Sequence, residues 1–342
     1  MSLVNLSVNL NVDLNVDISE DGLIEASKMG RIVSLFYAVK NDHLKLAEYL
    51  ILNGTLVDTK NEHMETPLLC VISQLIRPFY IETNRETKFK MAKLLIKAGA
   101  DVNYKYEGMS ILHRAIKYDK PDVVLFLIEN GANINIQDSV GRTPLYFALS
   151  NDRFKIAILL LDLDADPNIG DKVGIYPLEM AAQNAELDLI LKLISKTKDV
   201  NLLGKKSALH YAAKRCKYEV VEKLIEKGAL LDAKDKNGKI PLHYICNTYN
   251  DAPDGVLSLQ IAKLLVEKGS SINVKDKEGN TPLHVATWRR KIDIAKILID
   301  FGADINLKNN NGNKPMDFIF GELQSSIMEY INDDSIFIKG AQ

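Results

Sequence analysis

Cysteine is scarce in this sequence: the chain of 342 residues has three, and they lie far apart. Cys70, Cys216 and Cys246 form no CxxC pair, so neither a disulfide framework nor a zinc site is indicated. Each falls in or just after a segment with helical apolar spacing, where a buried thiol usually acts as a small hydrophobic group. A reducing compartment is the simplest setting for such a chain.

Long apolar runs and an excess of either charge are also missing. No segment approaches the roughly 18 apolar residues of a membrane-spanning helix, and the first residues lack the basic start and apolar stretch of a secretion signal. The 43 basic and 45 acidic residues give a formal net charge of −2, which indicates no attraction of the whole molecule to nucleic acid or anionic lipid. We therefore expect a protein of the cytosol, its own or a host's, that binds no membrane.

The dominant feature that is present is an internal repeat. Nine segments share a short motif, in which a small or polar residue is usually followed by proline, then leucine, then often histidine. They begin at Val33, Thr66, Ser110, Thr143, Tyr176, Ser207, Ile240, Thr281 and Lys314. Five of the eight intervals between successive first positions are 33 residues long, so the chain is built from one repeated unit.

Two further marks keep step with the first. A glycine follows sixteen residues after the small residue that ends the motif, as in the pairs Ala38 and Gly54, Ala115 and Gly131, Ala212 and Gly228, and Ala286 and Gly302. The pattern Asp-x-x-Gly opens units at Asp138, Asp171, Asp235 and Asp276. Thr or Ser before Pro favours a helix start, the later Gly favours a left-handed helix end, and Asp-x-x-Gly favours a turn. Each unit therefore has two helices and a hairpin, and the units must stack to bury their apolar faces.

This pattern resembles the ankyrin repeat, with eight units and a partial ninth over residues 31–319. The resemblance implies an all-α repeat solenoid of helix-turn-helix units joined by β-hairpin loops. We expect residues 1–30 to form an N-terminal extension and residues 320–342 a C-terminal cap and tail. Insertions within residues 72–90 and 247–259 fall between the two helices of their units, where they either contact a partner or extend a helix.

Two units depart from the pattern. Asp164 and Thr197 stand where the helix-ending glycine is expected, and the unit that starts near Asn201 is two residues short before Ser207. We therefore expect the segment from about residue 162 to residue 204 to be the least regular part of the stack.

Residues 1–18 follow a different rule, because apolar residues from Val4 to Ile18 alternate strictly with Asn, Ser and Asp. This period of two is typical of a β-strand. Two interpretations remain open: the segment pairs with a partner or a second copy by β-augmentation, or it is a tail that is disordered or lies along the first repeat.

The sequence contains little that indicates a catalytic, metal-binding or nucleotide-binding site. Four of the six histidines share one motif slot, and a repeated helix-start position favours a scaffold role in which the side chain hydrogen-bonds the backbone; they are His113, His210, His243 and His284. His43 and His63 have no neighbouring ligand pattern. Gly204-Lys-Lys-Ser is similar to the end of a phosphate-binding loop, but Asp199 stands where that loop needs its first glycine. We predict no catalysis, cofactor, metal site or small-molecule substrate.

We therefore expect the function to be the binding of a partner by exposed residues. In the ankyrin family, partners bind at the hairpin tips and at the exposed end of the inner helix, on one concave face. The sixteen helix-end positions mapped here include no acidic residue and five basic ones. Trp288 is the only tryptophan and falls in such a variable slot, and Trp and Arg are enriched at binding hot spots. The expected partner-binding residues are Trp288, Arg289, Arg290, Lys214, Arg215, Lys117, Tyr118, Arg142, Lys239 and Lys277.

The sequence favours a non-catalytic scaffold that binds a protein partner, with an acidic segment of that partner in the groove. One alternative is a substrate-recognition adaptor of a ubiquitin ligase, or a host-targeting effector of a virus or intracellular bacterium, although residues 320–342 show no clear F-box-like segment. Another is nucleic-acid binding by the basic groove. At Trp288 the competing interpretation is packing on the adjacent helix, with the nearby charges as ordinary solvated surface.

The alternating segment yields a first prediction. Deletion of residues 1–20 is expected to change oligomeric state or partner binding, because an exposed strand edge recruits another strand. Light scattering and affinity capture measure both properties, and a deletion that alters neither removes the β-augmentation hypothesis.

Overall fold

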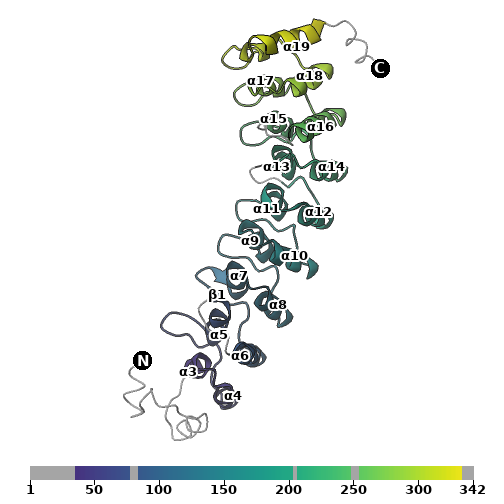
Figure 1. Cartoon of the computed structure of the whole chain (residues 1–342). Coiled ribbons are helices and arrows are strands. Elements are labelled where there is room, and N and C mark those ends of the chain that lie inside the picture. Colours follow the sequence, from purple (N-terminus) through teal and green to yellow (C-terminus); the bar gives the residue numbers. More distant parts are fainter. Residues whose placement is uncertain (1–34, 78–83, 203–205, 248–253, 333–342) are drawn as a thin grey trace. The chain divides into compact units, whose positions relative to one another are not determined.

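The computed structural model describes residues 35–77, 84–202, 206–247 and 254–332 (Figure 1). These ranges contain seventeen α-helices, one 3-10 helix and one two-stranded sheet. The predicted strand in residues 1–18 and the end of the predicted C-terminal tail lie outside them. The chain divides into two compact units, Met1–Leu160 (unit 1) and Leu161–Gln342 (unit 2), each of which is described by itself.

Unit 1 is built from helix pairs, in which an inner helix is followed by an outer one. The inner helices are α3 (Leu35–Lys40), α5 (Pro67–Ile76), α7 (Ile111–Lys117) and α9 (Pro144–Ser150). The outer helices are α4 (Leu44–Leu52), α6 (Arg85–Lys97), α8 (Pro121–Glu129) and α10 (Phe154–Asp162), whose last turn crosses the unit boundary. Helices α3, α5 and α7 each pack on the next inner helix and on their own outer helix.

Unit 2 repeats this arrangement. Its inner elements are α11 (Pro177–Asn184), α13 (Ala208–Lys214), α15 (Pro241–Cys246), α17 (Pro282–Trp288) and the 3-10 helix η1 (Pro315–Phe318). Its outer helices are α12 (Leu187–Lys196), α14 (Tyr218–Glu226), α16 (Asp254–Glu267), α18 (Ile292–Asp300) and α19 (Glu322–Asn332). Inner elements pack on inner and outer on outer in chain order, which confirms the predicted all-α repeat solenoid.

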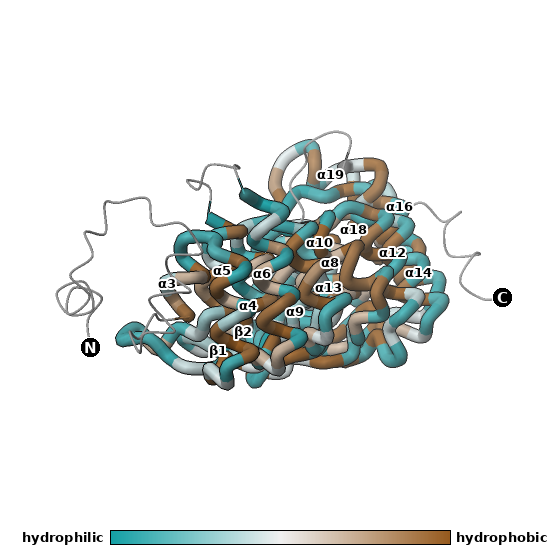
Figure 2. Tube along the Cα trace, turned by 90° about the horizontal axis from the view of Figure 1, so that it is seen from below, coloured by the Kyte–Doolittle hydropathy of each residue, from teal (hydrophilic) through white to brown (hydrophobic). Residues whose placement is uncertain are grey.

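Every helix pair buries one apolar face against its neighbours. Figure 2 shows brown apolar and teal polar stretches alternating along the helices, as expected where each helix has one buried side. In α14, for example, Val220, Val221 and Leu224 are fully buried, whereas Glu219 and Glu226 on the opposite face are exposed. The core is therefore a series of thin layers shared between consecutive repeats.

The predicted helix starts are confirmed in detail. Thr143 Oγ1 accepts a hydrogen bond from the backbone N–H of Tyr146 at 3.2 Å, and the other motif hydroxyls do the same. These are Thr66, Ser110, Ser207 and Thr281. Three inner elements, α11, α15 and η1, have no such hydroxyl, and in each the third residue accepts the backbone N–H of the residue before the helix, as Asp317 does for Lys314. A Glu179 oxygen accepts from the N–H of Tyr176, and His243 Nδ1 accepts from the N–H of Ile240.

The scaffold role of the repeated histidine is also confirmed. In unit 2, His210 Nδ1 accepts the N–H of Ser207 at 3.1 Å, and its Nε2 lies 2.9 Å from the carbonyl oxygen of Lys239 in the next hairpin. An acceptor at Nδ1 and a donor at Nε2 require the neutral imidazole. Each such histidine therefore ties the start of one helix to the hairpin of the following repeat.

The Asp-x-x-Gly segments form tight turns, as predicted. Asp235 Oδ1 accepts the N–H groups of Asn237 and Lys239, both at 2.8 Å, and the Asp235 N–H closes the turn on the Lys239 carbonyl. Within the described residues one hairpin reaches the length of paired strands, β1 (Lys105–Tyr106) with β2 (Met109–Ser110), and Lys105 stands there in place of the Asp. The predicted β-hairpin loops are thus mostly turns closed by one or two hydrogen bonds.

The two departures at the helix-ending glycine behave differently. Asp164 adopts the left-handed conformation with φ of 61°, whereas Thr197 is extended with φ of −78° and ψ of 128°. The short polar side chain of Asp tolerates the left-handed region, but a β-branched side chain is strained there. Thr197 instead donates its hydroxyl to the carbonyl of Leu193 at 2.8 Å.

The two insertions coincide with long outer helices. Helices α6 and α16 have 13 and 14 residues, whereas α4, α8, α14 and α18 have nine each. Part of each insertion thus extends the outer helix, and the remainder, residues 78–83 and 248–253, lies outside the described ranges.

The buried histidines generate a second prediction. Burial lowers the pKa of His113, His210, His243 and His284 below the usual 6.5. The unfolded chain therefore takes up these protons at a higher pH than the folded one. The contribution of these neutral histidines to the free energy of unfolding is fully present above about pH 6.5. It is lost as the pH falls, by up to about 1.4 kcal/mol per pH unit for each histidine.

Urea unfolding midpoints measured from about pH 7.5 down to about pH 5.5 test this dependence. The variant His210→Gln is expected to weaken the pH dependence, whereas His63→Gln, at an exposed position, leaves it unchanged. A midpoint that does not move over this range contradicts the prediction.

Candidate binding surface

The hairpin face of unit 2 is defined here as the C-terminal ends of α13, α15 and α17 together with the hairpins that precede these helices. It holds seven of the ten residues expected to bind a partner: Lys214, Arg215, Lys239, Lys277, Trp288, Arg289 and Arg290. The other three, Lys117, Tyr118 and Arg142, belong to unit 1. Lys117 and Tyr118 are exposed at the end of α7, with Tyr118 39% exposed.

Arg142 has a structural role in its own hairpin. Its Nε donates to Asp138 Oδ2 at 2.7 Å, and its guanidinium lies 4.9 Å from the centre of the Phe147 ring. Burial acts to raise the pKa of Asp138, but hydrogen bonds from the backbone and side chain of Arg142 lower that pKa overall. The ion pair therefore stabilises the turn, and Arg142 has little of its charge free for a partner.

Trp288 and Arg289 form one unit at the end of α17. Trp288 is 59% exposed, so its ring is not part of the core. The Arg289 guanidinium lies 4.5 Å from the Trp288 ring, and Arg289 Nε donates to Asn247 Oδ1 at 2.5 Å. Asn247 comes from the preceding repeat, so two repeats together hold this cation against the exposed aromatic ring.

A second group of cations lies one to two repeats earlier, and sequence reasoning missed its central member, Lys206. The Lys206 Nζ lies 4.4 Å from the centre of the Tyr244 ring and 5.6 Å from that of Tyr211. Lys206 occupies the position before the helix-starting hydroxyl, the slot held by Arg142 and Lys239 in other repeats. That shared slot was the signal that could have identified it.

The electrostatics of Lys206 show which charges surround it. Burial lowers its pKa, and the charges of Lys214, Lys236 and Lys239 lower it further, while Asp235 raises it. We call Lys206, Lys214, Lys236 and Lys239 the lysine cluster. Lys214 and Lys236 are exposed, and Lys206 and Lys239 are half-buried.

The carboxylate of the hairpin that carries Lys236 and Lys239 is fully engaged. Asp235 Oδ1 accepts two backbone N–H groups, and Oδ2 accepts the hydroxyl of Tyr244 at 2.6 Å. Burial acts to raise the pKa of Asp235, but these hydrogen bonds lower it overall, so the group stays ionised. Two carboxylates therefore lie beside the four lysines: Asp235, which the turn already uses, and Asp276, whose Oδ2 lies 3.7 Å from Lys239 Nζ.

Exposed acids of unit 2 gather elsewhere. Glu219, Glu226, Glu267, Asp293 and Asp300 are exposed on the outer helices α14, α16 and α18. The aspartates of the two central hairpins, Asp235 and Asp276, are buried in their turns, and Glu278 is exposed at a hairpin tip. Because the turn carboxylates are hydrogen-bonded within their hairpins while Lys214, Lys236 and Lys277 stay exposed, the hairpin face is more basic than the near-neutral net charge implies.

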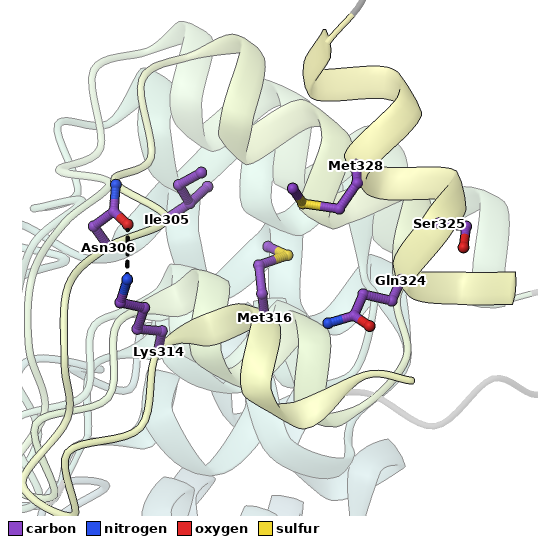
Figure 3. A pocket seen from close by; sticks show the side chains of 7 residues that line it. All are labelled: Ile305, Asn306, Lys314, Met316, Gln324, Ser325 and Met328. Carbon is purple, nitrogen blue, oxygen red and sulfur yellow. Dashed lines mark hydrogen bonds between the residues drawn. The ribbon is translucent and has the colours of Figure 1, made fainter. Parts of the chain in front are cut away.

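A cavity of about 450 Å³ lies beside the C-terminal cap (Figure 3). Met316 of η1 and Met328 of α19 face one another across it, and Lys314 Nζ donates to Asn306 Oδ1 at 3.1 Å on its rim. Its remaining lining is Ile305, Gln324 and Ser325. Nothing in this lining forms a nucleophile and base pair.

No group of three or more His, Cys, Asp or Glu side chains is placed to hold a metal ion in the part of the chain that the structure describes. Among the described helices, none has both the length and the apolar character needed to cross a membrane.

Comparison with known proteins identifies the repeat. The family model described as ankyrin repeats (3 copies) matches residues 35–138, 83–171, 178–257 and 232–309. The crystal structure of the ankyrin repeat domain of Bcl-3, titled a unique member of the IkappaB protein family, matches with a TM-score of 0.51 and 25% identity. That match covers 66% of this chain and all of the Bcl-3 chain.

Curated relatives match over shorter stretches. A putative ankyrin repeat protein, L86, of Acanthamoeba polyphaga mimivirus is 34% identical over 107 residues, which are 28% of this chain and 19% of the relative. Protein glp-1 of Caenorhabditis elegans is 28% identical over 33% of this chain and 9% of its own length. A putative ankyrin repeat protein, FPV230, of fowlpox virus is 38% identical over 20% of this chain and 37% of its own length. The matches thus span well under half of these relatives.

The position of Trp288 leads to a third prediction. Because the Arg289 guanidinium lies over its exposed ring and the exposed Arg290 follows in the sequence, iodide is expected to quench the fluorescence of Trp288 more strongly than caesium does. The variant Arg290→Gln should reduce this difference, and added salt should screen it. Equal quenching by the two ions, or quenching by neither, contradicts the arrangement.

Proposed function

Because this chain belongs to the ankyrin repeat family, whose repeats form protein–protein interaction modules, we propose that it is a non-catalytic scaffold that binds an acidic segment of a protein partner on the hairpin face of unit 2. The family and its fold generally serve as non-enzymatic scaffolds, and the four motif histidines of this chain are engaged in holding repeats together.

The observation that carries the proposal is the Trp288–Arg289 pair. A large exposed aromatic ring leaves apolar area that a partner can cover, and Trp and Arg are the residues most enriched at binding hot spots. Arg289 is already held by Asn247 and by the Trp288 ring, so little side-chain freedom is lost when a partner binds.

Charge supplies the second support. Lys214, Arg215, Lys277 and Arg290 are exposed on the hairpin face, and Lys239 is half-buried. Its Nζ lies 3.7 Å from Asp276 Oδ2, so part of its charge is already used. A basic face of this kind speeds encounter with an acidic segment and disfavours basic partners. Lys117 and Tyr118 of unit 1 are proposed as a smaller contact, and Arg142 is left out.

A second candidate function is an adaptor or effector role inside a host cell, including substrate recognition for a ubiquitin ligase. It is favoured by similarity to ankyrin repeat proteins of a mimivirus and of fowlpox virus. Either role places the protein in a cytosol, which fits a chain whose three cysteines lie far apart in the sequence. Self-association through residues 1–18 stays part of the proposal.

The double variant Trp288→Ala/Arg289→Ala provides the fourth prediction. Affinity capture with the intact chain and with this variant, read by mass spectrometry, identifies partners that depend on the pair. Their affinity is expected to fall at least about tenfold, equivalent to about 1.4 kcal/mol, while the melting temperature stays nearly unchanged.

A matched control removes one exposed aromatic ring and one cation from the outer helices instead. Phe301→Ala/Lys268→Ala changes residues of similar exposure at the ends of α18 and α16 and should leave capture intact. Unaltered capture by the Trp288/Arg289 variant rejects the site. Collapse of its fold assigns the pair to packing. Binding to RNA that falls steeply with salt and is lost in this variant favours the nucleic-acid alternative.

A further inference from the structure

The lysine cluster on the hairpin face of unit 2 is an unusual concentration of one charge. It draws on two hairpins and one helix end: Lys206 lies before α13, Lys214 at the end of α13, and Lys236 and Lys239 in the following hairpin. Like charges brought together repel one another, and the low pKa of Lys206 reflects both this repulsion and burial. An arrangement of this kind gains most from an anion that several lysines share.

The packing around Lys206 holds its ammonium group in place. Its Nζ lies over the Tyr244 ring at 4.4 Å, and Tyr244 is itself buried with its hydroxyl bonded to Asp235. A further contact to this tyrosine fixes the floor of the site, because His210 packs edge-on against the same ring. The position of the charge is therefore set by the stacking of two repeats.

The chemistry of the cluster favours a phosphate monoester over a carboxylate. A phosphorylated side chain carries a charge near −2 and three strong acceptor oxygens in one compact group, whereas an acidic side chain carries −1. Ammonium groups act as point charges that approach such a group from several directions, without the planar geometry by which Arg pairs with a carboxylate.

Nucleic acid fits the cluster less well. Single strands bind where bases stack on open aromatic rings beside a basic groove. Within the cluster, Tyr244 is buried, Tyr211 is half-buried, and Lys206 lies over the face of both rings. No open stacking platform remains next to these four lysines among the described residues.

We infer that the lysine cluster binds a phosphorylated serine or threonine in the partner segment, so that phosphorylation of the partner controls its capture. This inference rests on the proposed function, because the phosphate is carried by the protein segment that the hairpin face binds. Lys206 and Lys239 form the half-buried base of the site, and Lys214 and Lys236 form its exposed sides.

The test measures binding of the full chain to fluorescent degenerate peptide pools by anisotropy, at about 0.15 M ionic strength. The pools differ only at their central residue, which is phosphoserine, serine or glutamate. The phosphoserine pool is expected to bind about tenfold tighter than the serine pool and clearly tighter than the glutamate pool. Equal affinity for all three pools overturns the inference.

Two variants with the same loss of charge locate the site. Lys206→Gln/Lys236→Gln is expected to abolish the preference for phosphoserine, whereas Lys227→Gln/Lys268→Gln, at exposed outer positions, should keep it. Lys236→Gln alone, at an exposed position, serves if the double variant unfolds. Loss of preference in the outer variant, or its retention in the cluster variants, overturns the assignment. The assignment is also overturned if a single-stranded RNA binds the cluster more tightly than the phosphoserine pool does.

A phosphatase arm separates this inference from the proposed function. Partner capture from a lysate is compared before and after phosphatase treatment, with the Trp288→Ala/Arg289→Ala variant in parallel. Capture that depends on the Trp288–Arg289 pair but not on phosphatase rejects the phosphate site and leaves the proposed function standing. Capture that depends on neither rejects both, and capture that is lost in both arms supports both.

Discussion

The structure depends on the bond between a motif histidine and the hairpin of the next repeat. A single neutral imidazole satisfies the N–H at the start of one helix through Nδ1 and a hairpin carbonyl about thirty residues later through Nε2, as in His210, His243 and His284. These groups are buried, and a buried N–H or carbonyl without a partner is costly. Each repeat therefore needs the next one, which is why the helix pairs stack rather than fold alone.

The hairpins also satisfy their backbone N–H groups with side chains, and this determines which charges remain on the surface. Each Asp of the Asp-x-x-Gly turn accepts backbone N–H groups, and Asp235 also accepts the hydroxyl of Tyr244. The carboxylates are consumed in building the turn, while the lysines on either side remain accessible. A chain with near-zero net charge thus presents a basic hairpin face, with exposed acids on its outer helices.

Recognition residues are held by contacts that cross from one repeat to the next. Arg289 is fixed by Asn247 of the preceding repeat, and Lys206 lies over a tyrosine of the following one. In both places the stacking that stabilises the solenoid also holds a cation against an aromatic ring. These side chains are already ordered when the chain folds, so their ordering subtracts little from the free energy of partner binding.

Much of the fold could be read from the sequence, because stacking residues recur at a fixed spacing. The helix-starting hydroxyls, the Asp-x-x-Gly turns and the scaffold role of the histidines follow from local chemistry, and the structure confirms them. Of the surface, the exposure of Trp288 was predictable from its slot, whereas the structural role of Arg142 and the central place of Lys206 were not. The first depends on how Arg142 folds back on Asp138 of its own hairpin, and the second on which tyrosine of the next repeat lies beside Lys206.

The sequence by itself determined the repeat, its length and the type of each element, since these depend on short patterns that each repeat carries within itself. Only the tertiary structure decided which charges are free, because that depends on which donors and acceptors each charged side chain meets in the folded chain. Asp235 and Lys236 are neighbours with equal and opposite charge in the sequence, yet the folded turn and the Tyr244 hydroxyl engage the first in hydrogen bonds, whereas the second is exposed to solvent.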